Sequence, residues 1–340
     1  FNGTSVFVAI DKQTDRTCDV ILNPPSGLRY QRWKVATSLQ PAGALLREFG
    51  RYRAQNYDDL IDHPVEMGDF DVETFEVSGV PHDLVVSGKH RADLKRVRRD
   101  LAVICAHHVD LFGELPKMER YVFLVMCVGN GYGGLEHRSS TSLICSRDDL
   151  PLEHIAEVTD EYRAFLGLCS HEYFHTWNVK RIKPEVFTPY DLSQESHTRL
   201  LWVFEGITSY YDDLTLARTG LISVTSYLEL LGKALTRLYQ NPGRKVQTVT
   251  DSSFDAWTKF YKQDENAGNA IVSYYIKGAV IACALDLIIR SRCKVSANIG
   301  KSLDDVMRGL WKKSRGQRTL TRYHVTIRPS VSVPCGADDA

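Results

Sequence analysis

The chain lacks an excess of charge of either sign, because its 42 lysine and arginine residues are balanced by 42 aspartate and glutamate residues. A neutral protein has no overall field that recruits nucleic acid or an anionic membrane. The basic run from Lys89 to Arg99 overlaps an amphipathic helical pattern, for which a solvated face is the usual explanation. We therefore expect neither a nucleic-acid partner nor a membrane partner.

Long apolar runs and targeting segments are also lacking. The longest apolar stretches, such as Gly278 to Ile289, are interrupted by Asp286 or are too short to cross about 30 Å of hydrocarbon. Phe1 to Asp11 has no basic region followed by an apolar core, so no signal peptide is visible. We expect no membrane span. Because the first residue is not methionine, we expect a fragment of a longer chain or a trimmed one.

Paired cysteines are lacking as well, since none of the eight cysteines belongs to a Cys-x-x-Cys motif. Their scatter does not indicate a disulfide framework. Five of them lie in apolar surroundings and are expected to be reduced core residues of a cytoplasmic protein: Cys105, Cys127, Cys145, Cys169 and Cys283.

What is present is the composition of an ordinary globular protein, with 43% hydrophobic and 25% charged residues. Alternation predicts a strand over Asp71 to Val80, a helical period predicts a helix over Asp93 to Phe112, and Tyr121 to Val128 is a predicted strand. Longer helical patterns follow over Leu152 to Val179, Glu195 to Arg218, Val224 to Tyr239, Ser273 to Ser291 and Ser302 to Lys313.

This order of elements predicts an α+β fold in three parts. Residues 1–62 are strand-like and rich in turns, and we interpret them as the remnant of a β-rich N-terminal domain. Residues 63–315 are expected to form a small mixed α/β lobe followed by a mainly helical lobe. Residues 316–340 are polar and are expected to be an irregular tail.

A metal site is predicted at His171-Glu172-Tyr173-Phe174-His175. On a helix the two histidines lie about 40° apart and one turn displaced, so both imidazoles can reach one ion. Glu172 lies about 100° from His171, where it can act as a general base without binding the metal. Two surface histidines beside an acid are the alternative, but apolar flanks indicate a buried helix whose polar groups need partners.

Glu205 is the expected third ligand, because it is the one carboxylate in the apolar segment Leu200 to Tyr211. Burying it without a partner would cost several kcal/mol, whereas a cation keeps it ionised. The alternative is a buried glutamate paired with an arginine such as Arg199. Two histidines and one glutamate leave a fourth position open, which is the arrangement of a catalytic zinc site.

These segments resemble the gluzincin metallopeptidases, and within them the glycyl aminopeptidase family. The resemblance is carried by His171 to Ile182 and Leu201 to Asp213, and the wide gap between the second histidine and the glutamate is typical of the family. It extends from about Tyr57 to about Lys313 and implies a thermolysin-like zinc peptidase domain at 63–315. Family members normally continue into a PDZ domain, which 316–340 does not resemble.

The segment Gly133-Gly134-Leu135-Glu136-His137 resembles the Gly-x-Met-Glu-Asn motif of aminopeptidase N-like enzymes. The resemblance implies that Gly133 and Gly134 bind the substrate backbone and that Glu136 grips its free amino group. Leu135 and His137 depart from the motif. Independently of the family, glycines give a ligand access to the backbone, and a carboxylate beside them suits an ammonium. A turn with an incidental surface acid is the alternative.

Tyr275 is the matching position of a Tyr-x-Lys-Gly segment whose tyrosine stabilises the tetrahedral intermediate in the same peptidases. Its phenol could donate to the developing oxyanion, and Ser273 is a plausible helix N-cap. Tyr274 is the rival, and an aromatic residue that only packs is the alternative for both.

The expected protein is therefore a zinc aminopeptidase acting on peptides with a free N-terminus. A preference for glycine or alanine at the first position is implied by the resemblance alone. A zinc endopeptidase with the same chemistry, or a peptide-binding relative without activity, is the alternative.

Overall fold

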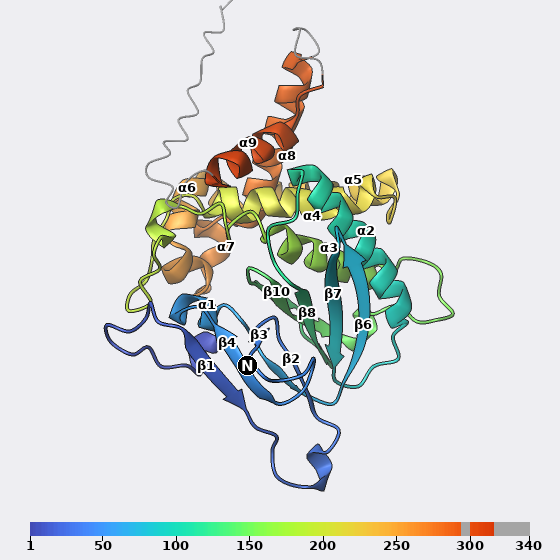
Figure 1. Ribbon diagram of the computed structural model, residues 1–340. Coiled ribbons are helices and arrows are strands. Elements are labelled where there is room, and N and C mark those ends of the chain that lie inside the picture. The colour runs from blue at the N-terminus through green and yellow to red at the C-terminus, as the bar shows by residue number, and fades with distance from the viewer. Residues whose placement is uncertain (294–299, 316–340) are drawn as a thin grey trace, which may run out of the picture.

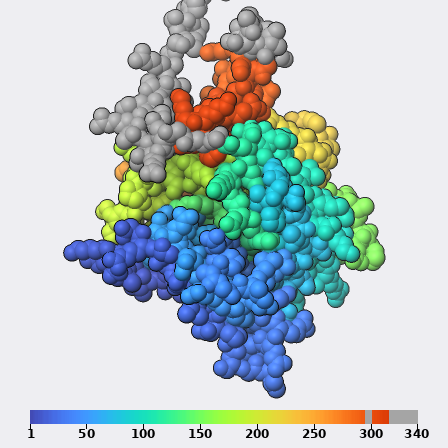
Figure 2. All heavy atoms as spheres, in the orientation of Figure 1, coloured from blue at the N-terminus to red at the C-terminus, as the bar shows by residue number. Residues whose placement is uncertain are grey.

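The computed structural model describes residues 1–293 and 300–315, and the predicted tail at 316–340, with Cys335, lies outside the described residues. Figure 1 shows the N-terminal strands at one end, a larger sheet in the middle and most of the helices at the other end. In Figure 2 the N-terminal part lies against the middle of the molecule.

The N-terminal part has two small antiparallel sheets, as the strand-like sequence predicted. One sheet has the order β1-β4-β3 and the other pairs β2 with β5. Their bounds are β1 (Cys18–Leu22), β2 (Lys34–Ala36), β3 (Gln40–Pro41), β4 (Gly50–Ala54) and β5 (Glu66–Gly68), and the helix α1 (Tyr57–Ile61) lies between β4 and β5. A separate small core containing Val20, Val35 and Tyr52 holds this part together.

The central sheet has five strands in the order β6-β7-β8-β10-β9. Its strands are β6 (Phe70–Val77), β7 (Val80–Ser87), β8 (Tyr121–Val128), β9 (Gly133–Glu136) and β10 (Ser140–Ser146). The pairs β7–β8 and β8–β10 are parallel, so α2 (Leu94–Phe112) serves as the crossover between β7 and β8. Strand β9 is antiparallel to β10 and forms an edge of the sheet.

The rest of the described chain is mainly helical, which confirms the predicted α+β class. Its helices are α3 (Asp160–Phe174), α4 (Ile207–Arg218), α5 (Val224–Gln240), α6 (Val249–Phe254), α7 (Ala267–Ala270), α8 (Tyr274–Cys293) and α9 (Leu303–Arg315). One core that includes Phe123, Phe174 and Tyr211 joins α2, α3 and α4 to the sheet.

Helix α3 is shorter than the helix predicted over Leu152 to Val179. The guanidinium of Arg96 donates to the carbonyls of Ala156 and Glu157, which holds the preceding segment outside the helix. The Thr159 hydroxyl then caps α3 by accepting from the Tyr162 backbone N–H at 3.1 Å. The start of this helix was predicted too early because it is set by a tertiary contact, which the helical spacing of apolar residues does not reveal.

One helical stretch in the described part of the chain, Ala267–Cys293 with 27 residues, is long and apolar enough to cross a membrane by length and composition alone. In its most apolar window 33% of the residues are buried inside the protein, and core helices of soluble proteins pass the same test. The cysteines at Cys105, Cys127, Cys145 and Cys169 are buried free thiols, whereas Cys283 is half-buried. The cytoplasmic location and the absence of a membrane partner stay predictions.

Candidate metal centre and substrate cleft

Three predicted ligands meet at the end of α3. The Nε2 atoms of His171 and His175 lie 3.2 and 3.3 Å from Oε2 of Glu205. One ligand atom from each of the three side chains lies within 4.8 Å of the others, so a single ion could bind all three. His175 is 1% exposed, so at least this ligand is shielded from bulk water.

The other nitrogen of each imidazole is held by the protein. Nδ1 of His171 lies 3.0 Å from Oδ2 of Asp212, and Nδ1 of His175 donates to the carbonyl of Asn178 at 2.7 Å. These bonds place the protons on Nδ1 and leave both Nε2 lone pairs directed at the shared position. This is the outer arrangement that metal-binding histidines show.

Asp212 was not predicted, although a usable pattern was present. It follows Glu205 by seven residues, which is about two helical turns, so both carboxylates fall on one face. Burial raises the pKa of Asp212, while its hydrogen bond to His171 opposes that rise. A buried acid in this position serves to orient an imidazole.

Glu205 lies on a π-helical turn, Trp202–Gly206, that precedes α4. The Asn178 amide donates to the carbonyls of Val203 and Phe204 at 3.3 and 3.2 Å, which supports the widened turn. Such turns often accompany functional sites. The alternative pairing of Glu205 with Arg199 is wrong, because Arg199 binds Asp251 instead.

Glu172 is buried and its Oε2 atom has no hydrogen-bond partner among the described residues. Its other oxygen lies against the backbone of Gly134, where an added Cβ would come within 2.2 Å of it. Burial raises the pKa of Glu172, and the charges of His171 and His175 only partly offset that rise. An unpartnered carboxylate that gains a proton readily suits a general base.

Glu136 ends the edge strand β9 and lines a cleft of about 840 Å³ together with Glu205 and Tyr274. A Cβ added to Gly133 would meet no atom within 4 Å, so the backbone there is accessible. An edge strand offers unpaired N–H and C=O groups to an extended peptide. The predicted substrate-binding residues thus lie beside the predicted metal ligands.

Tyr275 lies near the metal ligands, with its ring centroid 6.3 Å from that of His171. Two glycines allow this approach, because a Cβ on Gly206 would lie 2.5 Å from Cα of Gly278, one turn after Tyr275. Burial and the charge of Glu205 raise the pKa of Tyr275, so the phenol stays a proton donor.

The rival Tyr274 shares a hydroxyl cluster with Tyr275. The Tyr261 hydroxyl lies 3.1 Å from that of Tyr275 and 3.2 Å from that of Tyr274. Ser273 caps α8 as predicted, since its Oγ accepts from the Ile276 N–H at 3.2 Å. The contact of the Tyr275 ring with His171 supports Tyr275 as the donor, whereas Tyr274 lines the cleft.

Comparison with known proteins identifies the family. Residues 164–281 match the M61 glycyl aminopeptidase family, and residues 1–69 match the N-terminal domain of M61 peptidases. A crystal structure of an aminopeptidase N family protein from Idiomarina loihiensis is 48% identical, with a TM-score of 0.88 over 92% of this chain. The chain belongs to the M61 glycyl aminopeptidase family.

This M61 chain covers 52% of the Idiomarina loihiensis chain, so it spans about half the length of that relative. No curated protein matches it. The family match over 164–281 includes most of α3, the π-helical turn and the start of α8. The limits of the three predicted parts, 1–62, 63–315 and 316–340, stay predictions.

Proposed function

We propose that this M61 chain is a zinc-dependent aminopeptidase that hydrolyses the first peptide bond of peptides with a free N-terminus. One observation carries the proposal. Two imidazole Nε2 atoms and one carboxylate converge beside the buried Glu172, whose Oε2 atom has no hydrogen-bond partner in the described part of the chain. A set of two histidines and one glutamate is that of a catalytic zinc site with an open position, and bound zinc supplies Lewis acidity that activates water and polarises a carbonyl.

The protein's own groups move the protons. Glu172 takes a proton from the attacking water and later delivers it to the leaving amine, as its buried position and raised pKa allow. Tyr275 donates its phenolic proton in a hydrogen bond to the oxyanion that develops on the scissile carbonyl. His171 and His175 keep their orientation because Asp212 and the Asn178 carbonyl hold their Nδ1 atoms.

Glu136 sets the exopeptidase register in this proposal. Its carboxylate lies in the same cleft as Glu205, so it can receive the substrate ammonium while the first peptide bond reaches the metal ligands. Strand β9 then pairs with the substrate backbone. A preference for glycine at the first position is proposed from the family description, and alanine is added from the sequence resemblance.

The test uses glycyl and alanyl peptides in free and N-acetylated forms, with and without a chelator. We expect release of the first residue from the free peptides only, and loss of this activity with the chelator. Equal cleavage of both forms would indicate an endopeptidase and remove the role of Glu136. No cleavage of either peptide by the zinc-loaded protein would indicate a peptide-binding relative and contradict the proposal.

A further inference from the structure

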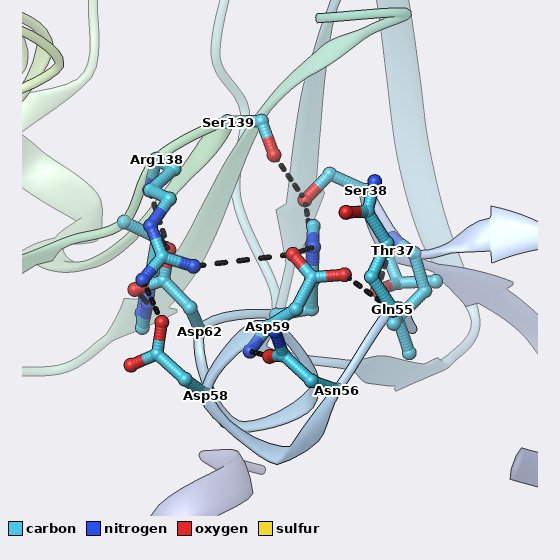
Figure 3. A network of polar contacts seen from close by, with 12 residues as sticks. Thr37, Ser38, Gln55, Asn56, Asp58, Asp59, Asp62, Arg138 and Ser139 are labelled. Carbon is cyan, nitrogen blue, oxygen red and sulfur yellow. Dashed lines mark hydrogen bonds and ion pairs between the residues drawn. The ribbon is translucent and has the colours of Figure 1, made fainter. Parts of the chain in front are cut away.

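Asp62 is a buried carboxylate that connects the N-terminal part to the cleft. It follows α1, and its residue is 7% exposed. Its Oδ1 atom lies 2.6 Å from Nζ of Lys180, and its Oδ2 atom accepts from the backbone N–H of Arg138 at 2.9 Å. Nδ1 of His137 lies 3.4 Å from Oδ1. Figure 3 shows the acidic side chains of α1 and Asp62 gathered around Arg138.

These partners adjoin the residue that is proposed to bind the substrate's amine. His137 and Arg138 directly follow Glu136, so a hydrogen bond from the Arg138 backbone to Asp62 fixes the chain at the end of β9. Lys180 and Asp62 line the same cleft as Glu136. Asp62 therefore contacts both the segment that carries Glu136 and the nearby cation of Lys180.

The cation matters because it is buried and would compete with the substrate. The Lys180 side chain is 11% exposed, and burial lowers its pKa, but Asp62 and then Glu136 outweigh that effect and raise it. For Asp62 the effect of burial is to raise the pKa, but Lys180, His137 and Arg138 outweigh it and hold the pKa well below its usual range. Both groups are charged, and without Asp62 the Lys180 ammonium would repel a substrate ammonium and attract Glu136.

We propose that Asp62 is a positioning residue for recognition of the substrate's amino group, acting by fixing the chain after Glu136 and by neutralising Lys180. This inference rests on the proposed aminopeptidase function. It gives the N-terminal part a role in substrate recognition through Asp62.

The first test is Asp62→Asn. We expect KM for a free glycyl peptide to rise about tenfold, equivalent to a tenfold loss of affinity, with kcat and metal content close to wild type. KM for the N-acetylated peptide should not change, because that peptide has no ammonium. The control is Asp19→Asn, which removes an exposed N-terminal carboxylate that pairs with Arg53 at 2.7 Å and should leave both constants unchanged.

The second test is Lys180→Met, for which the sign of the effect is opposite. Removing the cation leaves Asp62 to add to the negative potential around Glu136, so KM for the free peptide should fall about threefold. A merely structural ion pair predicts that both variants raise KM, because each breaks the same pair. A rise or no change of KM in Lys180→Met would overturn the inference. This test also holds if a melting experiment shows that Asp62→Asn does not fold.

The inference and the proposed function fail in different ways. If Glu136→Gln raises KM for the free peptide while Asp62→Asn does not, the function stands and the role of Asp62 is wrong. If the wild-type protein hydrolyses neither peptide, the proposed function is wrong. The role of Asp62 is then tested by measuring the binding of the same two peptides by calorimetry. Equal affinity of wild type and Asp62→Asn for the free peptide would then overturn its role.

Discussion

The two ends of the cleft are built in different ways. The metal corner, defined here as His171, His175 and Glu205, has two of its three residues one helical turn apart at the C-terminal end of α3, and hydrogen bonds to Asp212 and to the Asn178 carbonyl orient their imidazoles. The amine end, defined as Glu136, Asp62 and Lys180, comes from three segments that are distant in the sequence. A buried ion pair, rather than a helical spacing, holds the amine end together.

This difference separates two kinds of kinetic effect. In the proposed mechanism, groups of the metal corner act on the reacting bond, so changes there should lower kcat. Groups of the amine end are proposed to act on a part of the substrate that does not react, so changes there should mainly raise KM for free-amine peptides. Variants that violate this division would break the comparison.

The largest effect is expected for Glu172→Gln beside the metal corner. The amide keeps the shape but cannot take a proton, so kcat should fall by about 10² to 10⁴-fold while the metal stays bound. Glu161→Gln, in the exposed first turn of the same helix, is the matched control. Full activity of Glu172→Gln in a steady-state peptide assay would remove the general base from the account.

The next effect is expected for Tyr275→Phe, which removes the proposed donor to the oxyanion. We expect kcat to fall by about 10² to 10³-fold with little change in KM. Tyr274→Phe removes the neighbouring hydroxyl of the same cluster and should lose far less. If kcat falls more in Tyr274→Phe than in Tyr275→Phe when both are measured in the same assay, Tyr274 is the donor.

A smaller effect is expected for Asp212→Asn, which weakens the hold on Nδ1 of His171. Zinc affinity, measured by competition with a chelator of known affinity, should fall by about 10- to 100-fold. Asp213→Asn is the matched control, because burial beside Asp212 raises the pKa of Asp213 and already favours its neutral form. Equal zinc affinity of Asp212→Asn and wild type would show that the helix alone orients His171.

The last prediction concerns the pH dependence of folding stability, measured by urea unfolding. His108 lies behind α3, with Nε2 2.9 Å from Oγ of Ser170, and burial lowers its pKa to about 3. In the unfolded chain a histidine has a pKa of about 6.5, so the unfolded state takes up the proton first as pH falls. The difference in the free energy of unfolding between wild type and His108→Asn should therefore decrease below pH about 6.5, by about 1.4 kcal/mol per pH unit.

In the same urea-unfolding measurement, Asp62 has the same sign of pH dependence as His108 but a lower pH window. Its folded pKa is lowered, so its contribution is present above its unfolded pKa of about 3.9 and is lost only as pH falls below that value. The difference between wild type and Asp62→Asn should stay constant from pH about 7 to about 5. A parallel decline in both differences between pH about 7 and about 5 would contradict these two pH windows.

The sequence revealed those features that depend on local spacing. His171 and His175 are one helical turn apart, and Glu205 is a lone carboxylate in an apolar segment, so their meeting could be predicted. Strand β8 has the bounds that its composition predicted. The roles of Glu172, Tyr275 and Glu136 needed the family resemblance or the chemistry of the metal as well.

The remaining features depend on contacts between distant segments. No local pattern shows that Asp62 pairs with Lys180, because α1 and the chain after α3 meet only in the folded protein. The late start of α3 depends on Arg96, which lies on α2. The π-helical turn that presents Glu205 depends on the amide of Asn178. Such partners are chosen by tertiary packing, which overrides local propensity.

The most direct measurement is a zinc titration of the metal-stripped protein, followed by metal analysis and by hydrolysis of a free glycyl peptide. The account predicts that stripped protein is inactive and that bound zinc and activity rise together to saturation at about one ion per chain, as a single site of three ligands requires. Activity that persists in the stripped protein, or zinc that binds at one equivalent without hydrolysis, would contradict it.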